Sequence, residues 1–270
     1  MNQLNHTWLT IDCDDIRHIP KNQGHPTRSK KKINTNQLSS QFSKGLIGFE
    51  KWFNSHNSPA TLFIIADSLE NKEFREWLVT LISSFPQRIT IGCHGLTHRS
   101  WSAWPEDSEG FQTAINQACD KIKNIVGESF RPWFRAPAGY MAPWMADVLK
   151  RSGIILDSSI NDTLLTKSKT GKGNSWAKVR QSVIGANLVE REWATKWRLP
   201  INGPALSIFP LSLLAKHAWK KLPPVLKTNV LTSSVEDSDV SIKTVYWHLL
   251  DHGKSMGNWQ PPIPHSILNH

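Results

Sequence analysis

The segment WLTIDCDD, residues 8–15, runs from apolar and β-prone residues directly into three carboxylates. In an extended chain alternate side chains share a face, so Asp12 and Asp14 point to one side and Cys13 to the other. Two carboxylates on one face repel each other, and we therefore expect a cation or an arginine between them. Asp15 could replace Asp14 at this position if the strand ends early or bulges.

A second polar segment, CHGLTH at residues 93–98, carries His94 and His98 four residues apart. This spacing puts both imidazoles on one side of a helical turn, where they can share one ion. Two unrelated histidines are the alternative, but the nearby carboxylates favour the metal. With Asp14 they would form a two-histidine, one-carboxylate site with open positions, which suits Zn²⁺ or a similar divalent ion. Such an ion lowers the pKa of its bound water to about 7.

A hydrolase of this kind also needs a base for the water and an acid for the leaving group. Asp12 is placed for the first role. His248, within VYWHLLDHG, is the candidate for the second, with His252 in reserve, although a core histidine is the alternative for His248. Cys13 and Cys93 lie beside the predicted site, but free cysteine is usually a small buried hydrophobe, so we leave both out of the ligand set.

These side chains must be positioned by an alternation of short strands and amphipathic helices. The apolar pattern predicts strands at 8–12, 60–65, 88–92, from Phe134, 154–156 and 243–250, and helices at 37–56, 71–84, 107–127 and 143–152. Such alternation indicates βα units and a parallel sheet or barrel. The polar residues fall at or after strand ends, and in this architecture the carboxyl ends of the strands converge on one face. That convergence is the main argument for a shared site.

The chain resembles the polysaccharide deacetylase family, the NodB-like carbohydrate esterases. LTIDCDD, HGLTH, FRAPAGY, ILDSS and VYWHLL occur in the order of the five motifs of that family, over residues 8–160 and again at 243–250. The Asp-x-Asp first motif, and Trp101 three residues after His98, resemble the branch that includes the deformylase of formamido-arabinose carried by undecaprenyl phosphate. The resemblance implies a distorted, incomplete (β/α) barrel. It also implies one catalytic domain over 1–270, with a basic loop at 17–36 and a less regular basic insertion at 163–240.

The resemblance also implies roles for the acids and metal ligands. Asp12 would be the catalytic base, while Asp14, His94 and His98 would bind the divalent ion, Zn²⁺ first and Co²⁺, Ni²⁺ or Mn²⁺ as alternatives. Arg135, the first residue of RAPAG, would pair with Asp12 and hold it ionised.

Four further residues take their roles from the same resemblance. Ala138 stands where many relatives have tyrosine, and its backbone N–H would help hold the oxyanion. Asp157 would orient His248, the acid that protonates the departing amine. Trp101 would contact substrate. The implied activity is hydrolysis of an N-acetyl or N-formyl group on an amino sugar, in a glycan or a lipid-phosphate-linked saccharide.

The formal net charge of +10 is concentrated in acid-free stretches from Ile16 to Phe49 and from Trp193 to Val235. Basic runs indicate polyanionic partners or a solubilising surface. Residues 205–222 combine leucines, Phe209 and Trp219 with lysines, as in segments that lie on anionic bilayers; an ordinary core helix is the alternative. We see no secretory signal and no spanning stretch, and three cysteines, an odd number at unrelated spacings, favour a reducing compartment. We expect a cytoplasmic enzyme, peripheral on the membrane face, with no nucleic acid partner.

Two other functions remain open at this point. Relatives of the fold also act on small cyclic amides, so an amide hydrolase of a non-sugar substrate is one alternative. A non-catalytic basic module that binds lipid or nucleic acid is the other. A binding module has no use for the combined acids, histidines and arginine described above, and this set favours the enzyme.

Overall fold

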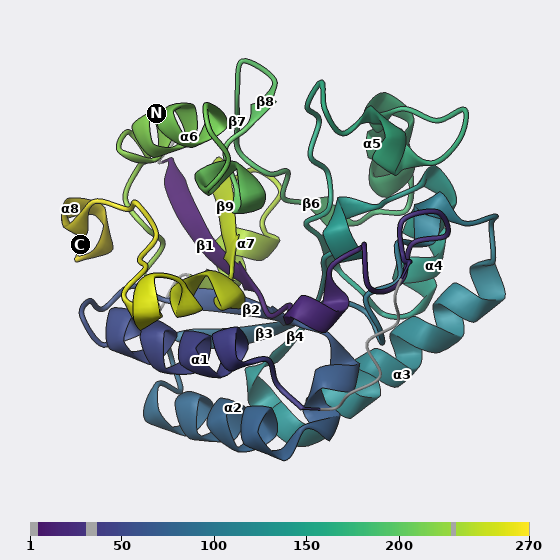
Figure 1. The fold of residues 1–270 in the computed structure, drawn as a ribbon. Helices are drawn as coiled ribbons and strands as arrows, with labels where there is room; N and C mark the ends of the chain where they lie inside the picture. The colour runs from purple at the N-terminus through teal and green to yellow at the C-terminus, as the bar shows by residue number, and fades with distance from the viewer. Residues whose placement is uncertain (1–4, 31–36, 228–230, 270) are drawn as a thin grey trace.

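A curled sheet of seven parallel strands forms the centre of the molecule (Figure 1). The computed structural model describes residues 5–30, 37–227 and 231–269. The strand order is β6-β5-β4-β3-β2-β1-β9. The strands are β1 (His6–Asp12), β2 (Ala60–Ile64), β3 (Ile89–Cys93), β4 (Phe130–Phe134), β5 (Leu156–Asp157), β6 (Val189–Glu190) and β9 (Ile242–His248). A parallel bridge between Trp193 and Thr244 joins the two edges at one point, so the expected distorted, incomplete barrel is confirmed.

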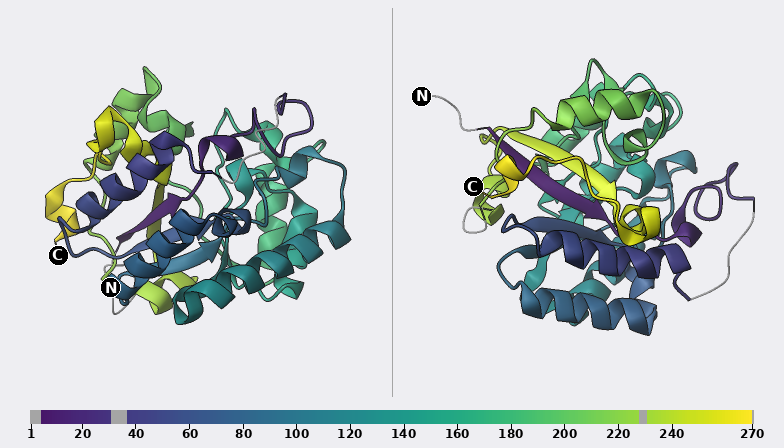
Figure 2. Two further views of the ribbon diagram at one scale, coloured as in Figure 1. Left: turned by 60° about the horizontal axis from the view of Figure 1, so that its bottom comes forward. Right: turned by 60° about the vertical axis from the view of Figure 1, so that its left-hand side comes forward.

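Helices cover the outer face of the curled sheet, as the two turned views in Figure 2 make clear. They are α1 (Ser40–Phe53), α2 (Lys72–Ser84), α3 (Ser108–Val126), α4 (Pro143–Arg151), α5 (Trp176–Gly185), α6 (Leu211–Trp219), α7 (Leu231–Glu236) and α8 (His265–Leu268). Side chains at caps define several helix starts, as Ser39 does for α1 by accepting a hydrogen bond from the backbone N–H of Phe42. Gly127 ends α3 at a φ of 54°. None of the described helices is long and apolar enough to cross a membrane.

The alternation of β1 separates the barrel interior from the helix layer. Trp8 belongs to a small interior cluster with Phe63 and Trp133, whose ring centroids lie 6.0 and 5.5 Å from that of Trp8. Leu9 belongs to the larger core between the sheet and the helices. Because side chains two apart share a face, the interior row that starts at Trp8 continues to the acid at the end of the strand.

The predicted helices and the first three predicted strands are confirmed within two or three residues, and the bounds of the other three strands are wrong. β4 ends at Phe134 and does not start there, since its backbone already pairs with β3 at Phe130. β5 consists of Leu156 and Asp157, so Asp157 lies in the strand and not after it. The last strand stops at His248, because the following residues turn into the 3₁₀ helix Leu249–Gly253.

The less regular stretch 163–240 supplies elements that periodicity did not predict. It contributes edge strand β6, the antiparallel pair β7 (Thr195–Lys196) and β8 (Leu199–Pro200), and helices α5 to α7. The described part of the basic loop, residues 17–30, packs back on the molecule. Gly24, at a φ of 80°, lies against the backbone carbonyl of His98 and leaves no room for a Cβ there. Its own carbonyl accepts a hydrogen bond from the N–H of Ser100.

Candidate metal centre and active site

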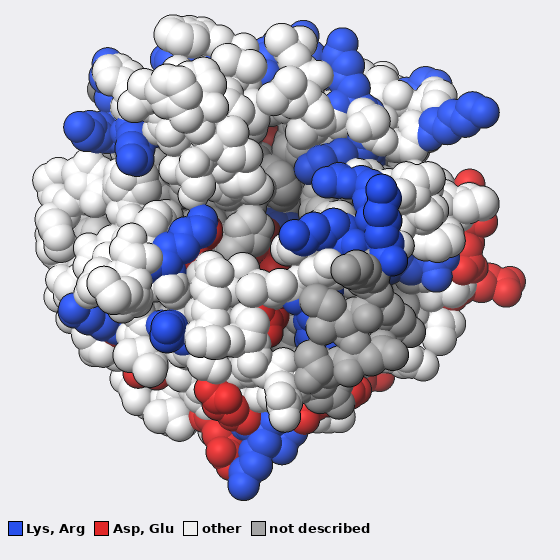
Figure 3. Space-filling model, in the orientation of Figure 1, with Lys and Arg blue, Asp and Glu red and all other residues white. Residues whose placement is uncertain are grey.

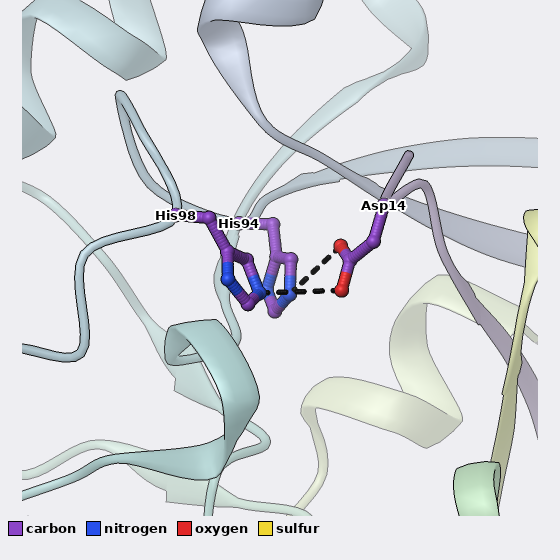
Figure 4. Close-up of side chains that lie close together, drawn as sticks. All are labelled: Asp14, His94 and His98. Atoms are coloured by element: carbon purple, nitrogen blue, oxygen red, sulfur yellow. Dashed lines mark ion pairs between the residues drawn. The ribbon is translucent and has the colours of Figure 1, made fainter. Parts of the chain in front are cut away.

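Asp14, His94 and His98 meet at the carboxyl ends of β1 and β3 (Figure 4). The Nε2 atoms of His94 and His98 lie 3.4 and 3.2 Å from the two carboxylate oxygens of Asp14. One potential ligand atom from each residue lies within 4.8 Å of the others, and all three side chains are buried. Elsewhere in the described residues no comparable cluster of histidine, cysteine and acid occurs. The structure therefore brings together the three residues that the sequence analysis grouped as metal ligands.

The backbone that joins the two histidines differs from our expectation. His94 to His98 form an irregular loop, and the predicted helical turn is wrong. Gly95 adopts a φ of 91°, which is incompatible with a right-handed helix. The loop still brings the two rings to a centroid distance of 5.3 Å.

The hydrogen bonds of His94 show that the cluster suits a cation. Its Nδ1 lies 2.8 Å from the carbonyl oxygen of Arg135. A carbonyl only accepts, so Nδ1 carries the hydrogen and Nε2 of the neutral ring presents a lone pair. Burial lowers the pKa of His94, which favours this neutral form. Its lone pair therefore faces the Asp14 carboxylate, and the two would repel unless a positive ion lay between them.

Unsatisfied polar atoms point to the same conclusion. Nε2 of His94, Nε2 of His98 and Oδ1 of Asp14 are buried without a hydrogen-bond partner among the described residues. Such atoms cost free energy unless a ligand satisfies them. Burial alone would raise the pKa of Asp14, but the neighbouring His98 holds that pKa well below its ordinary value. The carboxylate is thus ionised, and the donor set fits a divalent metal.

The Asp15 carboxylate is occupied by hydrogen bonds to the backbone and to Ser39, so it does not compete with Asp14 as a metal ligand. Its carboxylate caps the 3₁₀ turn Ile16–His18 by accepting from the N–H of Ile16 at 2.5 Å. The same carboxylate accepts from the N–H of Ser39 at 2.8 Å and from the Ser39 hydroxyl. These bonds tie the start of α1 to the end of β1. Cys13 and Cys93 are buried in the core and belong to no such cluster of the described residues.

The structure brings Arg135 to Asp12. Nη1 of the guanidinium donates to Oδ1 of Asp12 at 2.7 Å, and both groups are buried. Nε and Nη2 donate to the carbonyl and the hydroxyl of Ser158 at 3.0 and 2.9 Å. The guanidinium carbon lies 4.3 Å from the ring centroid of Phe63. Arg135 is thus fixed on three sides, and its positive charge meets the expectation of a cation beside the first motif.

His248 is the register partner of Asp12, because β1 and β9 are adjacent parallel strands. Its Nε2 lies 3.9 Å from Asp14, and its Nδ1 lies 3.6 Å from Asp251. Burial lowers the pKa of His248, but the ion pair with Asp251 and the charges of Asp14 and Asp12 outweigh burial and raise it to about 9. His248 is thus a cation at neutral pH, with a proton available.

Asp251, and not Asp157, is the acid that contacts His248. Asp157 accepts a hydrogen bond from the Ser159 hydroxyl at 2.6 Å and lies beside Glu190 in the β5–β6 register. Burial raises the pKa of Asp157, and burial and Asp157 together raise that of Glu190 well above its usual range. No hydrogen bond or ion pair joins Asp157 to His248 in the described structure, so that orienting role is wrong. Asp251 lies three residues after His248 in a turn that the sequence did not indicate.

Two other expectations also change. His252 is a core residue: it is buried, accepts a hydrogen bond from Nε1 of Trp247 at 2.9 Å and has its pKa lowered to about 4 by burial. Trp101 packs on Phe111 at 5.2 Å, with Arg99 over its ring, and does not line the cavity described next, so a substrate contact is not supported. Both positions are filled by packing because apolar side chains surround them.

The metal cluster opens into a cavity of about 530 Å³. Asp14, His98 and His248 form its polar end, and Trp193 and Tyr246 contribute aromatic walls, with ring centroids 4.3 Å apart. The backbone of Ala138, at a φ of 52°, lies on the same wall. The Trp193 contribution comes from the 163–240 stretch, and no periodic signal in the sequence could have identified it.

Comparisons with known proteins agree with the geometry. Residues 49–155 match the family model described as Polysaccharide deacetylase, a segment that includes His94, His98 and Arg135. No curated protein sequence matches the chain.

Solved structures extend the likeness to the whole fold. Two similar structures are assigned as polysaccharide deacetylases. One is from Mycobacterium smegmatis (14% identity, 96% of this chain and 81% of that chain, TM-score 0.59). The other is from Pseudomonas aeruginosa PAO1 (11%, 94% and 81%, TM-score 0.56). A third is the PuuE allantoinase (12%, 94% and 81%, TM-score 0.59). Residues 49–155 thus resemble the polysaccharide deacetylase family, and the whole chain shares the fold of these solved structures.

Proposed function

We propose that the protein is a divalent-metal-dependent hydrolase that removes an N-acyl group, acetyl or formyl, from an amino sugar. The observation that carries the proposal is the lone pair of His94 directed at the ionised carboxylate of Asp14, with His98 beside them. This arrangement needs a cation, and it lies at the end of a cavity large enough for a sugar.

When bound, Zn²⁺ or another divalent ion (Co²⁺, Ni²⁺ or Mn²⁺) would polarise the acyl group and lower the pKa of water to about 7. Asp12 takes the proton of the attacking water, and Arg135 holds the Asp12 carboxylate in position through the hydrogen bond from Nη1. His248, protonated and held by Asp251, gives its proton to the departing amine. The N–H of Ala138, a residue on the cavity wall, would donate to the acyl oxygen as negative charge develops on it.

A carbohydrate substrate is supported by the cavity walls and by the family match. The rings of Trp193 and Tyr246 give flat apolar surfaces of the kind against which a sugar ring packs. The substrate is an amino sugar of a glycan or of a lipid-phosphate-linked saccharide, in line with the Asp-x-Asp form of the first motif.

The lipid-linked form of the proposal is supported by the surface beside the cavity. Ile208 lines the cavity, and Phe209 and Leu213 continue outward from it with 77% and 61% of their surface exposed. Lys216 and Lys220 are exposed on or next to the same helix, α6, whose Trp219 is buried in the core. Apolar tips flanked by lysines suit contact with an anionic bilayer.

Sedimentation with anionic vesicles at physiological salt tests this contact. The double change Phe209→Ser and Leu213→Ser should release the protein into the supernatant. Ile47→Ser removes a side chain that is equally exposed, on α1, and should leave binding unchanged. Failure of the unaltered protein to sediment with anionic vesicles would remove the membrane proposal and leave the hydrolase proposal standing.

The hydrolase proposal is tested by measuring released acetate and formate from a panel of polymeric and lipid-linked amino sugars, with and without chelator. Asp14→Asn and His94→Ala should lose both bound metal and hydrolysis. Lys150→Gln, a change on the outer surface of α4, should retain both. Allantoin belongs in the panel, since an allantoinase shares the fold; release of product from allantoin alone would replace the sugar substrate by a cyclic amide. Hydrolysis that survives both site changes would overturn the proposal.

A further inference from the structure

Arg28 and Lys169 are two of the cations that line the cavity. Arg28 comes from the loop that precedes α1, and Lys169 comes from the 3₁₀ helix Lys167–Thr170 of the 163–240 stretch. Figure 3 shows lysine and arginine side chains gathered along one rim of the central hollow. The two residues are remote in sequence, so their meeting at one wall is a property of the fold.

Both cations are held in place around Tyr140. Nη1 of Arg28 lies 3.5 Å from the Tyr140 hydroxyl, which also lies 3.1 Å from Nε2 of His25. Nζ of Lys169 lies 5.7 Å from the centroid of the Tyr140 ring and donates to the carbonyl of Ala138 at 2.7 Å. Lys169 therefore binds the carbonyl of the same residue whose N–H is the proposed donor to the acyl oxygen of the substrate.

Neither cation has a carboxylate partner among the residues that the structure describes. Within the described part of the chain Arg28 and Lys169 form no ion pair, whereas Lys254, on the same cavity, lies 2.6 Å from Asp251. Burial, and then the charge of Arg28, lower the pKa of Lys169 to about 8. Two like charges kept close together at the wall of the cavity repel each other, and an anion between them would relieve this repulsion.

We propose that Arg28 and Lys169 form an anion subsite that receives a phosphate or carboxylate of the substrate. Resting on the proposed function, this assigns the amino sugar to the anionic class, with its charged group on the sugar itself or on the unit next to it. The phosphate can belong to a free sugar phosphate or to a lipid-linked one, and the chemistry at the subsite is the same. A neutral glycan would leave both cations uncompensated.

Titration calorimetry with the metal-free Asp14→Asn protein tests the subsite apart from catalysis. The probes are N-acetylglucosamine 1-phosphate, its farnesyl phosphodiester and the uncharged methyl N-acetylglucosaminide. The phosphate probes should bind at least about tenfold more tightly than the methyl glycoside, because hydrogen bonds to a charged group are stronger than those to a neutral one. Binding of the farnesyl phosphodiester alone indicates that the phosphate of the substrate is lipid-linked. Equal binding of the two phosphate probes indicates a free sugar phosphate. Both outcomes support the subsite.

Variants identify the residues. In this background Arg28→Gln and Lys169→Gln should each weaken phosphate binding about tenfold and leave binding of the methyl glycoside unchanged. Arg28 is exposed, so its substitution should not impair folding. Lys150→Gln removes the same charge from outside the cavity and should have no effect. Equal affinity for charged and uncharged probes, or equal weakening of both by the variants, would overturn the subsite. Phosphate binding without any acyl release by the unaltered enzyme would retain the subsite and overturn the hydrolase proposal instead.

Discussion

The pairing of His248 with Asp251 makes a quantitative prediction about the proposed acid. Asp251 is the largest influence that raises the pKa of His248 to about 9, ahead of Asp14 and Asp12. The rise from the ordinary value of 6.5 corresponds to about 3 kcal/mol in favour of the imidazolium, at about 1.4 kcal/mol per unit. Removing the negative charge with Asp251→Asn should lower this pKa by about one to two units.

The lower pKa has a direct effect on rate. A proton donor with a raised pKa keeps its active form to higher pH and loses it as the pH rises through that value. At pH 8 a group with a pKa of about 9 is about 90% protonated, and one with a pKa of about 7.5 is about a quarter protonated. We therefore expect Asp251→Asn to reduce kcat/KM about fourfold at pH 8, with its alkaline limb moved toward neutral pH.

Proton NMR titration of the His248 ring gives the pKa directly, in metal-free and Zn²⁺-loaded protein, beside the pH–rate profile. Asp157→Asn is the matched control, since Asp157 was the expected orienting acid but contacts Ser159. It should leave the His248 titration in place. A His248 pKa that is unchanged by Asp251→Asn, or that responds only to Asp157→Asn, would refute the assignment.

Three further predictions concern stability and metal content. The pKa of His252 is about 4 in the folded protein and 6.5 in the unfolded chain, so the unfolded chain binds the proton first as the pH falls. Stability should therefore decrease as the pH drops from 6.5 toward 4. Urea unfolding should show a loss of about 2 kcal/mol between pH 7 and pH 5, and His252→Asn should remove this loss. Arg135→Ala leaves the charge of Asp12 buried and unpaired, and should lower the free energy of unfolding in urea by about 3–5 kcal/mol; an effect below 1 kcal/mol would contradict the pairing. Asp15→Ala removes a cap and should cost about 1–2 kcal/mol of stability while elemental analysis finds the metal retained, the opposite of Asp14→Asn.

The sequence was most informative where the chain is periodic. Strand alternation in β1 placed Asp12 and Asp14 on one face, and the strand ends placed His94 and His98 near them, because parallel strands share one carboxyl edge. Cys13 is buried in the core, as expected. These relations depend on neighbours along the chain or on the general direction of strands, and both can be read from residue order.

Other parts of the site depend on contacts that residue order does not encode. The left-handed Gly95 turns the histidine segment into a loop, and a short 3₁₀ turn brings Asp251 back to His248. Lys169 and Trp193 reach the cavity from the 163–240 stretch, whose short elements show no clear periodicity in the sequence. Such positions follow from tertiary packing, and local propensity gives no signal for them.

The pairing of β9 with β1 also has a consequence for biosynthesis. β1 is made first and its partner β9 last, so at about 5–20 residues per second the open edge of β1 waits roughly ten seconds or longer for its neighbour. An unpaired strand edge is a template for aggregation during that time. Asp12 and His248 lie opposite each other in this last-formed pair. The proposed catalytic residues therefore come together only when β9 completes the sheet, and a nascent chain that lacks β9 has no complete active site.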